Sequence, residues 1–479
     1  MILTLDLGTS TTKAIVWDPA GPRAEARAPL DTRYPAPDRA EQDPESWWAS
    51  VTAACAALAQ TDPDALAAVE AVSFAAARQT LVPVTADGVP LGPALVWSDR
   101  RAGHQAAELA DALGGPDEAR RRTGAVLDGA SVAAKVAWLA EADPARLARA
   151  RWILTPRDLV LWKTTGEVVT DPTMVFAAGV AEPSGALVPE LVAAFADRLP
   201  PVVASDDVAG AVTPEAALAL GVPAGVAVVT GAGDRACEAL GTAASPARPF
   251  VAWGTTANLS VPADSFPSPV PPGLSVTAGA AGGWLLEGGL SAAGSLVRWL
   301  SSLTGLDPAA LLARAADSPP GARGVLALPW PGGARAPWWC GEARAGFLGL
   351  SLAHDAGDLA RAVIEAVALE VRRCLEATGA RPTTLALAGA DGPGPLWPDI
   401  LAAVTGLPAL RRRRGEAASA GAALLAGRAL GLGLDLDRLD PVVQTVDPDP
   451  DAVDRYRRLR PAADAAAAAV VGLAPADGR

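Results

Sequence analysis

The sequence predicts an α/β protein built from two related lobes that face each other across a cleft. Short apolar segments typical of strands alternate along the chain with longer segments of helical periodicity. The 479 residues exceed the usual size of one domain, and 50% are hydrophobic, so two large cores can form. A strand–turn–strand pattern around Gly8-Thr9-Ser10 recurs at Gly254-Thr255-Thr256, about half a chain later, which indicates two related halves.

The first half is predicted to begin with a β-hairpin, because two extended segments flank the Gly8–Ser10 turn. A helix is expected to follow, with Asp43 as its N-cap and Pro44 in its first turn. Helical periodicity also marks residues 131–147. The expected strands are Ile2–Asp6, Lys13–Trp17, Ala71–Ser73, Thr80–Val84 and Gly225–Val229.

The second half is predicted to start near Pro249 and to repeat the alternation of strands and helices. Its expected strands are Phe250–Trp253, Asn258–Val261, Trp284–Glu287 and Thr384–Leu387. Its expected helices are Gly289–Leu300, Asp355–Ala377 and Trp397–Thr405. The last of these strands opens into a glycine-rich loop, Gly389–Gly394, which lacks the spacing of a Walker A motif.

Charge and composition argue against several classes of function. The net charge is −13 and no long basic stripe is present, which disfavours nucleic-acid binding, and the short run Arg411–Arg414 is expected to be a solvated loop. Four scattered cysteines and two isolated histidines show no metal-ligand spacing, so neither disulfides nor a zinc site is expected. We find no signal-like segment and no apolar run long enough to span a bilayer, and therefore expect a soluble, cytoplasmic protein without a membrane partner.

The two Gly-Thr-Ser/Thr turns can each bind phosphate oxygens. Glycine allows close approach to the backbone, and N–H groups and small hydroxyls supply the donors. Asp6 stands just before the first turn, where a carboxylate can hold Mg²⁺ directly or through water, but Trp253 occupies that place in the second turn, so one metal is expected. Lys13 either contacts phosphate or faces solvent from its strand. Ordinary hairpin turns are the alternative for both segments.

Two acidic segments are candidates for the chemistry. Asp234 follows a buried strand and a Gly-Ala-Gly turn, from which its carboxylate can accept the proton of a hydroxyl that attacks a γ-phosphate. The alternative is a helix N-cap. Trp97 and Asp99 combine an aromatic face with a carboxylate, as carbohydrate sites do, and the alternative there is a surface turn held by salt bridges.

Taken in order, these motifs resemble the FGGY family of carbohydrate kinases, within the actin-like, sugar-kinase and Hsp70 ATPase superfamily. Asp6–Lys13 is similar to the first phosphate motif of the family, and Gly254–Thr256 to the second. Glu41–Trp48 is similar to the Glu-Gln-x-Pro-x-x-Trp-Trp stretch of xylulokinases. The other similar segments are Trp97–Arg100, Lys135–Leu139, Gly231–Asp234, Pro329–Pro337 and Gly421–Ala423.

The resemblance implies two actin-like (ribonuclease H-like) domains, residues 1–243 and 244–479, with mixed sheets flanked by helices. It implies transfer of the γ-phosphoryl group of ATP, with Mg²⁺, to a hydroxyl of a small sugar or polyol. Asp234 would be the catalytic base, Asp6 and Asp234 would hold the metal, and Arg78, Trp97, Asp99 and Asp234 would bind the sugar. The residues expected to bind ATP are Gly8, Thr9, Ser10, Thr11, Lys13, Gly254, Thr255, Gly389, Ala390 and Asp391. A homodimer is compatible with the resemblance.

Two departures from the family pattern bear on function. Phe74–Arg78 stands where xylulokinases have Gly-Gln-Met-His-Gly, and Arg78-Gln79-Thr80 is similar to the Arg-Glu-Thr of glycerol kinases. Gly389-Ala390-Asp391 replaces the Gly-Gly-Gly of the adenosine loop. A xylulose-like ketose is the first expected substrate and glycerol the second. A non-catalytic or slow homologue that senses sugar or nucleotide, and a nucleotide hydrolase, are the rival hypotheses.

Overall fold

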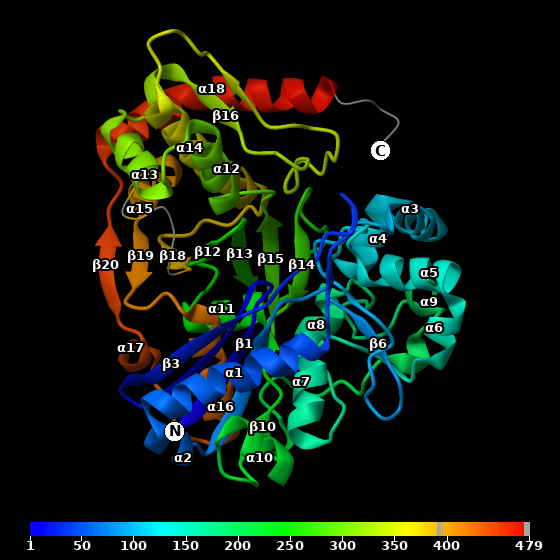
Figure 1. Cartoon of the computed structure of the whole chain (residues 1–479). Coiled ribbons are helices and arrows are strands. Elements are labelled where there is room, and N and C mark those ends of the chain that lie inside the picture. The colour runs from blue at the N-terminus through cyan, green and yellow to red at the C-terminus, as the bar shows by residue number, and fades with distance from the viewer. Residues whose placement is uncertain (390–393, 395, 474–479) are drawn as a thin grey trace.

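Two seven-stranded sheets organise the chain, one in each half (Figure 1). The computed structural model describes residues 1–389, 394 and 396–473. The first sheet has the order β3-β2-β1-β5-β10-β9, with β11 also paired to β5, and the second has the order β14-β15-β13-β12-β18-β19-β20. In each, an antiparallel hairpin, β1–β2 or β12–β13, continues into a parallel neighbour, β5 or β18. This shared topology confirms the two related α/β lobes.

The strands of the first sheet are β1 (Ile2–Leu7), β2 (Thr11–Asp18), β3 (Gly21–Pro29), β5 (Ala71–Ala76), β9 (Val208–Ala211), β10 (Ala227–Val229) and β11 (Ala232–Gly233). The helices of this half are α1 (Glu45–Thr61), α2 (Pro63–Ala67), α3 (Gly103–Ala112), α4 (Pro116–Thr123), α5 (Val132–Ala142), α6 (Pro144–Arg149), α7 (Pro156–Thr165), α8 (Pro172–Ala177), α9 (Pro189–Val192), α10 (Pro214–Leu220) and α11 (Asp234–Gly241). Two small ribbons pair β4 (Glu41–Gln42) with β7 (Ala94–Leu95), and β6 (Val82–Val84) with β8 (Trp152–Leu154).

The strands of the second sheet are β12 (Phe250–Trp253), β13 (Ala257–Ala263), β14 (Ser275–Ala278), β15 (Trp284–Gly289), β18 (Leu385–Ala388), β19 (Ala409–Arg412) and β20 (Val442–Val446). The helices are α12 (Gly294–Thr304), α13 (Pro308–Asp317), α14 (Ala356–Ala377), α15 (Leu396–Thr405), α16 (Ala417–Ala429), α17 (Leu436–Leu439) and α18 (Pro450–Leu473). A separate ribbon pairs β16 (Leu326–Leu328) with β17 (Gly346–Leu348). None of the helices in the described part of the chain is long and apolar enough to cross a membrane.

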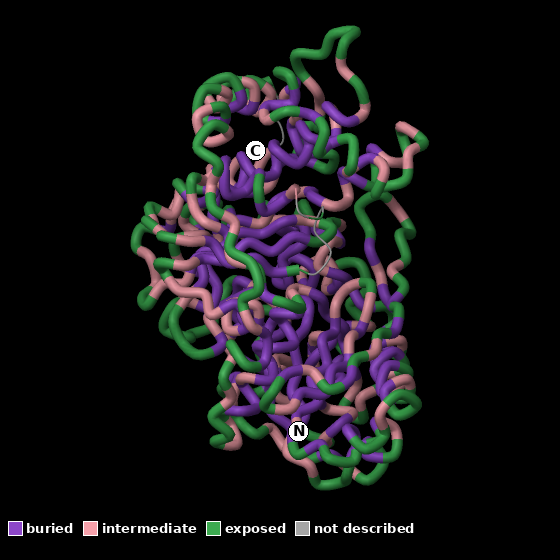
Figure 2. Tube along the Cα trace, turned by 90° about the vertical axis from the view of Figure 1, so that its left-hand side faces the viewer, coloured by how far each residue is buried: buried purple, intermediate pink, exposed green. Residues whose placement is uncertain are grey.

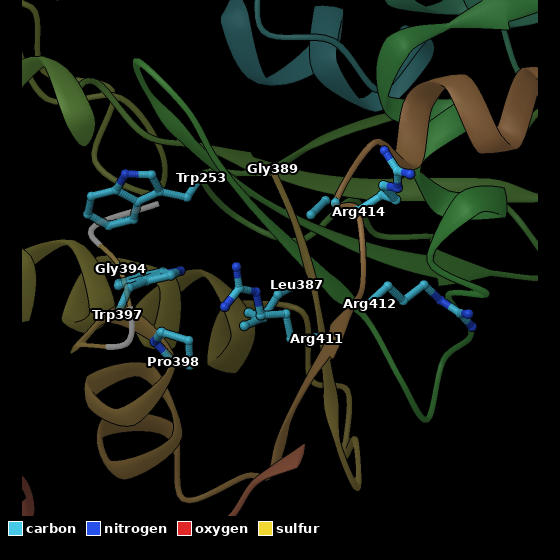
Figure 3. A pocket seen from close by; sticks show the side chains of 11 residues that line it. Trp253, Leu387, Gly389, Gly394, Trp397, Pro398, Arg411, Arg412 and Arg414 are labelled. Atoms are coloured by element: carbon cyan, nitrogen blue, oxygen red, sulfur yellow. The ribbon is translucent and has the colours of Figure 1, made fainter. Parts of the chain in front are cut away.

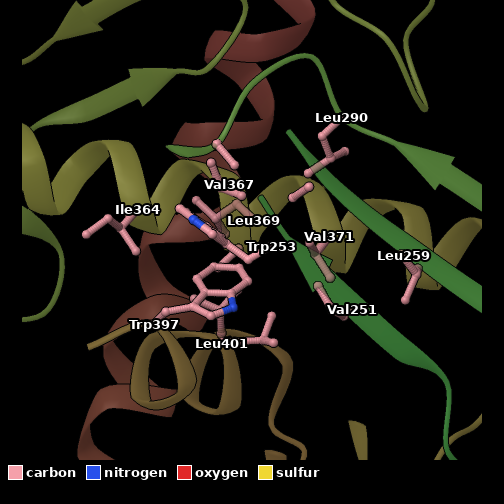
Figure 4. Packing of buried hydrophobic residues seen from close by; sticks show 14 of the residues in the cluster. Val251, Trp253, Leu259, Leu290, Ile364, Val367, Leu369, Val371, Trp397 and Leu401 are labelled. Atoms are coloured by element: carbon pink, nitrogen blue, oxygen red, sulfur yellow. The ribbon is translucent and has the colours of Figure 1, made fainter. Parts of the chain in front are cut away.

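Each half has its own apolar core, and the buried segments run through the interior of the molecule while exposed segments lie on its surface (Figure 2). In the second half, Trp253 at the end of β12 packs on Trp397 of α15, with their ring centroids 4.2 Å apart (Figure 4). Large aromatic side chains bury much apolar surface, so this pair fixes α15 against the end of β12. The Gly254–Thr256 turn, predicted to bind phosphate, starts at the next residue.

Helix α16 comes from the second half but packs against β1 and β5 of the first sheet. It crosses α11 in backbone contact. A Cβ atom at Gly241 would lie 1.9 Å from the carbonyl oxygen of Ala417, and one at Gly421 would lie 2.0 Å from that of Cys237. Glycine is therefore required at both crossing points, which explains the glycine of the Gly421–Ala423 segment. The crossing ties the second half directly to the helix that begins at Asp234.

Most predicted elements are present, and three boundaries were wrong. Residues 131–147 form two helices, because Pro144 begins α6 and Asp143 leaves the helical conformation, where its side chain caps Arg146 N–H at 3.0 Å. The helix expected from Gly289 begins at Gly294, since β15 extends through Gly289. Helix α1 begins at Glu45, and Asp43 lies outside it while accepting the Glu45 N–H at 3.1 Å.

Candidate active site

Strand register places Asp6 and Asp234 at the same edge of the first sheet. Asp6 on β1 pairs with Ala75 of β5, and Ala232 of β11 pairs with the same Ala75 from the other side. The three strands are parallel, so their carboxyl ends coincide. Asp234 follows β11 directly and starts α11. The two carboxylates therefore flank the end of β5, about two strand spacings (roughly 10 Å) apart along the sheet.

Asp6 is buried, and burial raises the pKa of its carboxyl to about 7. Lys13 opposes this rise, while the negative charges of Glu416, Asp234 and Glu238 add to it. A buried carboxylate with other acids nearby favours a cation beside it. The position fits Mg²⁺ held by Asp6 through water and completed by phosphate oxygens. The described residues contain no group of three or more acids, cysteines or histidines able to hold a metal alone.

Lys13 is partly exposed, and its ammonium group is paired with acids. Its Nζ lies 2.6 Å from Glu416 Oε2 and 3.9 Å from Asp6 Oδ2. Glu416 precedes α16 and also accepts from Arg27 Nη2 at 2.7 Å. Lys13 therefore links the first phosphate turn to a residue of the second half.

Asp234 lies in the first turn of α11 and accepts two hydrogen bonds at Oδ1. The Arg235 N–H donates at 2.8 Å and Arg78 Nε at 3.2 Å. Gly233, not Asp234, is the N-cap of this helix. Among the described residues none donates to Oδ2, and the side chain is 28% exposed. One oxygen of the carboxylate is thus held in place while the other is open to a ligand.

Arg78 joins this carboxylate to the second half of the chain. Its Nη1 and Nη2 donate to Glu287 Oε1 and Oε2 on β15 at 2.7 and 2.6 Å, and Nη1 also reaches Thr277 Oγ1 at 3.3 Å. Both side chains are largely buried. The sequence placed Arg78 at the substrate site but gave no indication of Glu287, because a single glutamate in a predicted strand carries no motif.

The first phosphate turn is held by two side chains from other segments. Trp97 Nε1 donates to Thr9 Oγ1 at 2.8 Å, and Gln42 Nε2 donates to the Thr9 carbonyl at 2.6 Å. Gly8 N–H closes the turn by donating to the Thr11 carbonyl at 3.1 Å, and Ser10 is exposed. Trp97 thus supports the turn through its indole N–H, a contact that its predicted role at the sugar does not include.

Asp99 is fully buried, which corrects the prediction that it contacts the sugar directly. Its carboxylate accepts from Ala40 N–H at 2.7 Å and from Arg101 Nε and Nη2 at 2.7 to 3.0 Å. Arg101 also donates to Glu41 at 2.7 Å. The physical reason is local: an arginine two residues along the chain neutralises the acid inside the turn. Asp99 shapes the segment that carries Trp97.

The second phosphate turn is exposed and packs against the start of α12. Gly254 N–H donates to the Thr256 carbonyl at 2.8 Å, and Ser295 N–H and Oγ donate to the Thr255 carbonyl at 3.1 and 2.9 Å. Arg298 Nη2 approaches Thr255 Oγ1 at 3.4 Å. The positive end of α12 and the Arg298 cation therefore lie beside this turn. Neither was predicted, although residues 288–294, mostly glycine, alanine and serine between a strand and a helix, were a usable signal.

A pocket of about 510 Å³, including its open mouth, lies next to the second turn (Figure 3). Trp253 and Trp397 form one side of it, and the arginines of β19 and the following segment form the other. Gly389 has φ 96°, and a Cβ there would lie 2.3 Å from the Trp253 carbonyl, so glycine is required. Ala390 and Asp391 lie outside the described residues.

The basic run 411–414 was predicted to be a solvated loop, but the structure shows otherwise. Arg411 and Arg412 end β19, and Arg412 is buried with its guanidinium 2.8 Å from Asp437. Arg411, Arg412 and Arg414 line the pocket. Cations thus lie beside an aromatic-walled pocket at the end of β12.

Two related lobes, acids on either side of the end of β5 and two hydroxyl-rich turns are the arrangement expected of a carbohydrate kinase. The chain belongs to the FGGY family of carbohydrate kinases. The model of the family's N-terminal domain matches residues 1–241, and that of its C-terminal domain matches residues 250–430.

Similar proteins include sugar and polyol kinases. The chain is 30% identical over 440 residues to xylulose kinase from Escherichia coli (strain K12), with 89% of each chain covered. It is 31% identical over 462 residues to glycerol kinase from Gloeobacter violaceus, with 91% of this chain and 90% of that one covered. The solved structure of xylulose kinase from Rhodospirillum rubrum matches with a TM-score of 0.86 at 29% identity, over 98% of both chains. The family implies the use of ATP and of small-molecule sugar substrates.

Proposed function

We propose that this enzyme transfers the γ-phosphoryl group of ATP to a hydroxyl of a small sugar, with a ketose such as xylulose as the first candidate. The observation that carries the proposal is the open Oδ2 of Asp234 on one side of the end of β5, with the buried Asp6 on the other side. A base and a metal-binding acid at this spacing serve in-line transfer between a hydroxyl and a phosphate.

In the proposed reaction, the acceptor hydroxyl oxygen forms a bond to the γ-phosphorus while the bond from that phosphorus to the bridging oxygen of ADP breaks. Asp234 accepts the hydroxyl proton, and Arg78 keeps the Asp234 carboxylate oriented. The two turns supply N–H and hydroxyl donors for the phosphates, and the pocket beside Gly389 receives the nucleoside. A bound Mg²⁺, held at Asp6, would neutralise the charge of the phosphates.

A second candidate is phosphorylation of glycerol or another polyol. The segment Arg78-Gln79-Thr80 favours this candidate. Arg78 contacts the proposed catalytic base Asp234, and the segment is similar to the Arg-Glu-Thr of glycerol kinases. The glycerol kinase relative supports the same candidate.

The test is ADP release, measured with a coupled assay on the full chain with a panel of ketoses, pentitols and glycerol. We expect ADP formation that depends on the acceptor. ADP formation indifferent to the acceptor would indicate a hydrolase. Calorimetric ATP binding without turnover on any acceptor would indicate a sensor.

A further inference from the structure

Arg335 holds a guanidinium on the same face of β15 that carries Glu287. A Cβ at Gly289 would lie 3.6 Å from the Cζ, Nη1 and Nη2 atoms of Arg335, so the guanidinium rests against this glycine. Residues 287 and 289 point to the same side of the strand, because side chains alternate. The Arg335 guanidinium thus lies at Gly289, two residues along β15 from Glu287. Glu287 binds Arg78, and Arg78 binds Asp234, the proposed base.

The position of Arg335 is fixed by its neighbours. The backbone N–H of Arg335 donates to Ser291 Oγ at 3.0 Å, and the backbone N–H of Ala336 donates to the Gly289 carbonyl at 3.2 Å. Trp339 lies on the guanidinium, with Cζ 5.6 Å from the ring centroid. A side chain held between a glycine and an indole loses little further freedom when it binds a ligand.

Arg335 lacks, among the described residues, the acidic partner that the arginines nearest to it have. Arg78 pairs with Glu287, Arg235 with Glu238 at 2.6 Å, and Arg100 with Asp128 at 3.5 Å. Within the described residues, Arg335 makes no salt bridge, its side chain donates no hydrogen bond, and its Nε is buried without a partner. The neighbouring residue, Ala334, has no charge to offer.

This unpaired state is costly, because a guanidinium stays protonated in a protein. Burial lowers the pKa of Arg335, while Asp128 and Glu287 oppose the shift and Arg100 and Arg235 add to it. Asp128 and Glu287 are already paired with other arginines, and the proposed reaction needs Asp234. Arg335 is therefore a fixed cation with no anion of its own among the residues that the structure describes.

We propose that the acceptor of this kinase is a sugar acid, a short polyhydroxy chain whose terminal carboxylate binds Arg335 while a distant hydroxyl meets Asp234. The inference rests on the proposed function and narrows its substrate class. Carboxylates match the donor geometry of a guanidinium, which favours two parallel hydrogen bonds. The bonds made and broken are those of the proposed transfer: the carboxylate stays ionised, the hydroxyl proton goes to Asp234, and ADP leaves.

The test compares acids and alcohols with the same carbon skeleton, namely glycerate with glycerol, erythronate with erythritol, xylonate with xylitol, and gluconate with glucitol. We expect at least one acid to have a kcat/KM about 10- to 100-fold above that of its neutral partner, the effect of a charge-assisted hydrogen bond. Arg335→Gln should raise the KM for that acid by a similar factor and so remove the preference, and Arg335→Lys should restore part of it. Arg344→Gln is the matched control, since Arg344 is an exposed arginine of the same segment.

Three outcomes would overturn the inference. Preference for the neutral partner in every pair would do so, and this wild-type comparison needs no variant to fold. An increase in the KM for ATP with every acceptor in Arg335→Gln would assign the cation to the nucleotide. No turnover of any acid would refute the acid proposal, whereas the kinase proposal would fail only if the ketoses and alcohols of the panel were not phosphorylated either.

Discussion

Arg78 and Glu287 form a two-pronged ion pair that connects the end of β5 with β15 in the other half of the chain. Both Nη atoms of Arg78 donate to the carboxylate, at 2.7 and 2.6 Å, while Nε donates to Asp234 at 3.2 Å. Burial would raise the pKa of Glu287, but Arg78 outweighs it and holds that pKa below its usual value. One guanidinium thus orients the proposed base and fixes the two halves around it.

We predict that Glu287→Gln destabilises the protein by about 3 kcal/mol, because it removes the two-point counter-charge of the buried Arg78 cation and leaves only the longer contact to Asp234. Urea unfolding of Glu287→Gln, Arg78→Gln and the double variant would give the coupling energy of the pair. Glu118→Gln is the control, since Glu118 pairs with Arg121 on the surface of α4 and its loss should not be measurable. Equal effects of the two glutamate variants would contradict the prediction.

Replacement of the proposed base separates chemistry from structure. Asp234→Asn should lower kcat by about 10²–10⁴-fold, because an amide cannot accept the hydroxyl proton. The nucleotide affinity, measured by calorimetry, should change little, and Asp117→Asn in the exposed first turn of α4 should leave both quantities unchanged. If nucleotide affinity and melting temperature fell together with kcat, Asp234 would have a structural role at the start of α11 instead.

Local sequence signals predicted the fold well where one segment determines its own conformation. The hairpin around Gly8–Ser10, the strand ending at Ala388 and the helix capped by Asp355 all form as expected. Their signals are alternation, glycine turns and a capping acid, which act within a few residues. The break at Asp143 was missed because helical periodicity continues across a proline that starts a new helix.

The site was predictable only in part, because several of its contacts join segments far apart in the sequence. Asp6 and Asp234 were proposed from the turns beside them, and strand register then places them on either side of Ala75. Asp99 had the right composition for a sugar contact, but Arg101 neutralises it inside its own turn. Nothing local marked Glu287, and Arg335 was noted only as part of the Pro329–Pro337 segment, without a role. The importance of both depends on which charges lie opposite them.

The pKa of Asp6, about 7 because of burial, predicts a pH dependence that Mg²⁺ should shift. At low Mg²⁺, kcat/KM for ATP should fall as the pH drops through about 7, since the protonated acid cannot hold the cation. Saturating Mg²⁺ should move this fall to lower pH. Asp6→Asn should abolish the difference between the two pH profiles, and identical wild-type profiles at both Mg²⁺ levels would contradict the assignment.

The same group should affect stability without ligands. The folded pKa of Asp6 is raised, so between pH 3.8 and about 7 the folded state binds more protons than the unfolded state. Its contribution to the free energy of unfolding should therefore decrease as the pH rises through this window. Chemical unfolding of the wild type and Asp6→Asn at pH 5 and pH 8 would measure the difference, and the variant should lose less stability at pH 8.

Lys135 offers a last test, of how the substrate segments are supported. It is fully buried on α5 and donates from Nζ to the carbonyls of Gln79 and Val96, at 3.1 and 2.7 Å. These residues adjoin Arg78 and Trp97. Lys135→Met would leave the Gln79 carbonyl without this donor, while the Val96 carbonyl would keep the Asp99 N–H at 2.9 Å. The variant should cost about 1–3 kcal/mol of stability, together with a higher acceptor KM. Lys163→Met is the control, because Lys163 pairs with the half-exposed Glu45 and should change stability by less than about 1 kcal/mol.

The effect of Lys135→Met should also depend on pH. Burial lowers the pKa of Lys135 to about 7, against 10.5 for an unburied lysine, so between these values the unfolded state binds more protons than the folded one. Wild-type stability should thus gain from this group as the pH rises from 7 to 10, and Lys135→Met should lack that gain. Urea unfolding of both proteins at pH 7 and pH 9 measures it, and an equal pH response in the two would show that Lys135 remains protonated in the fold.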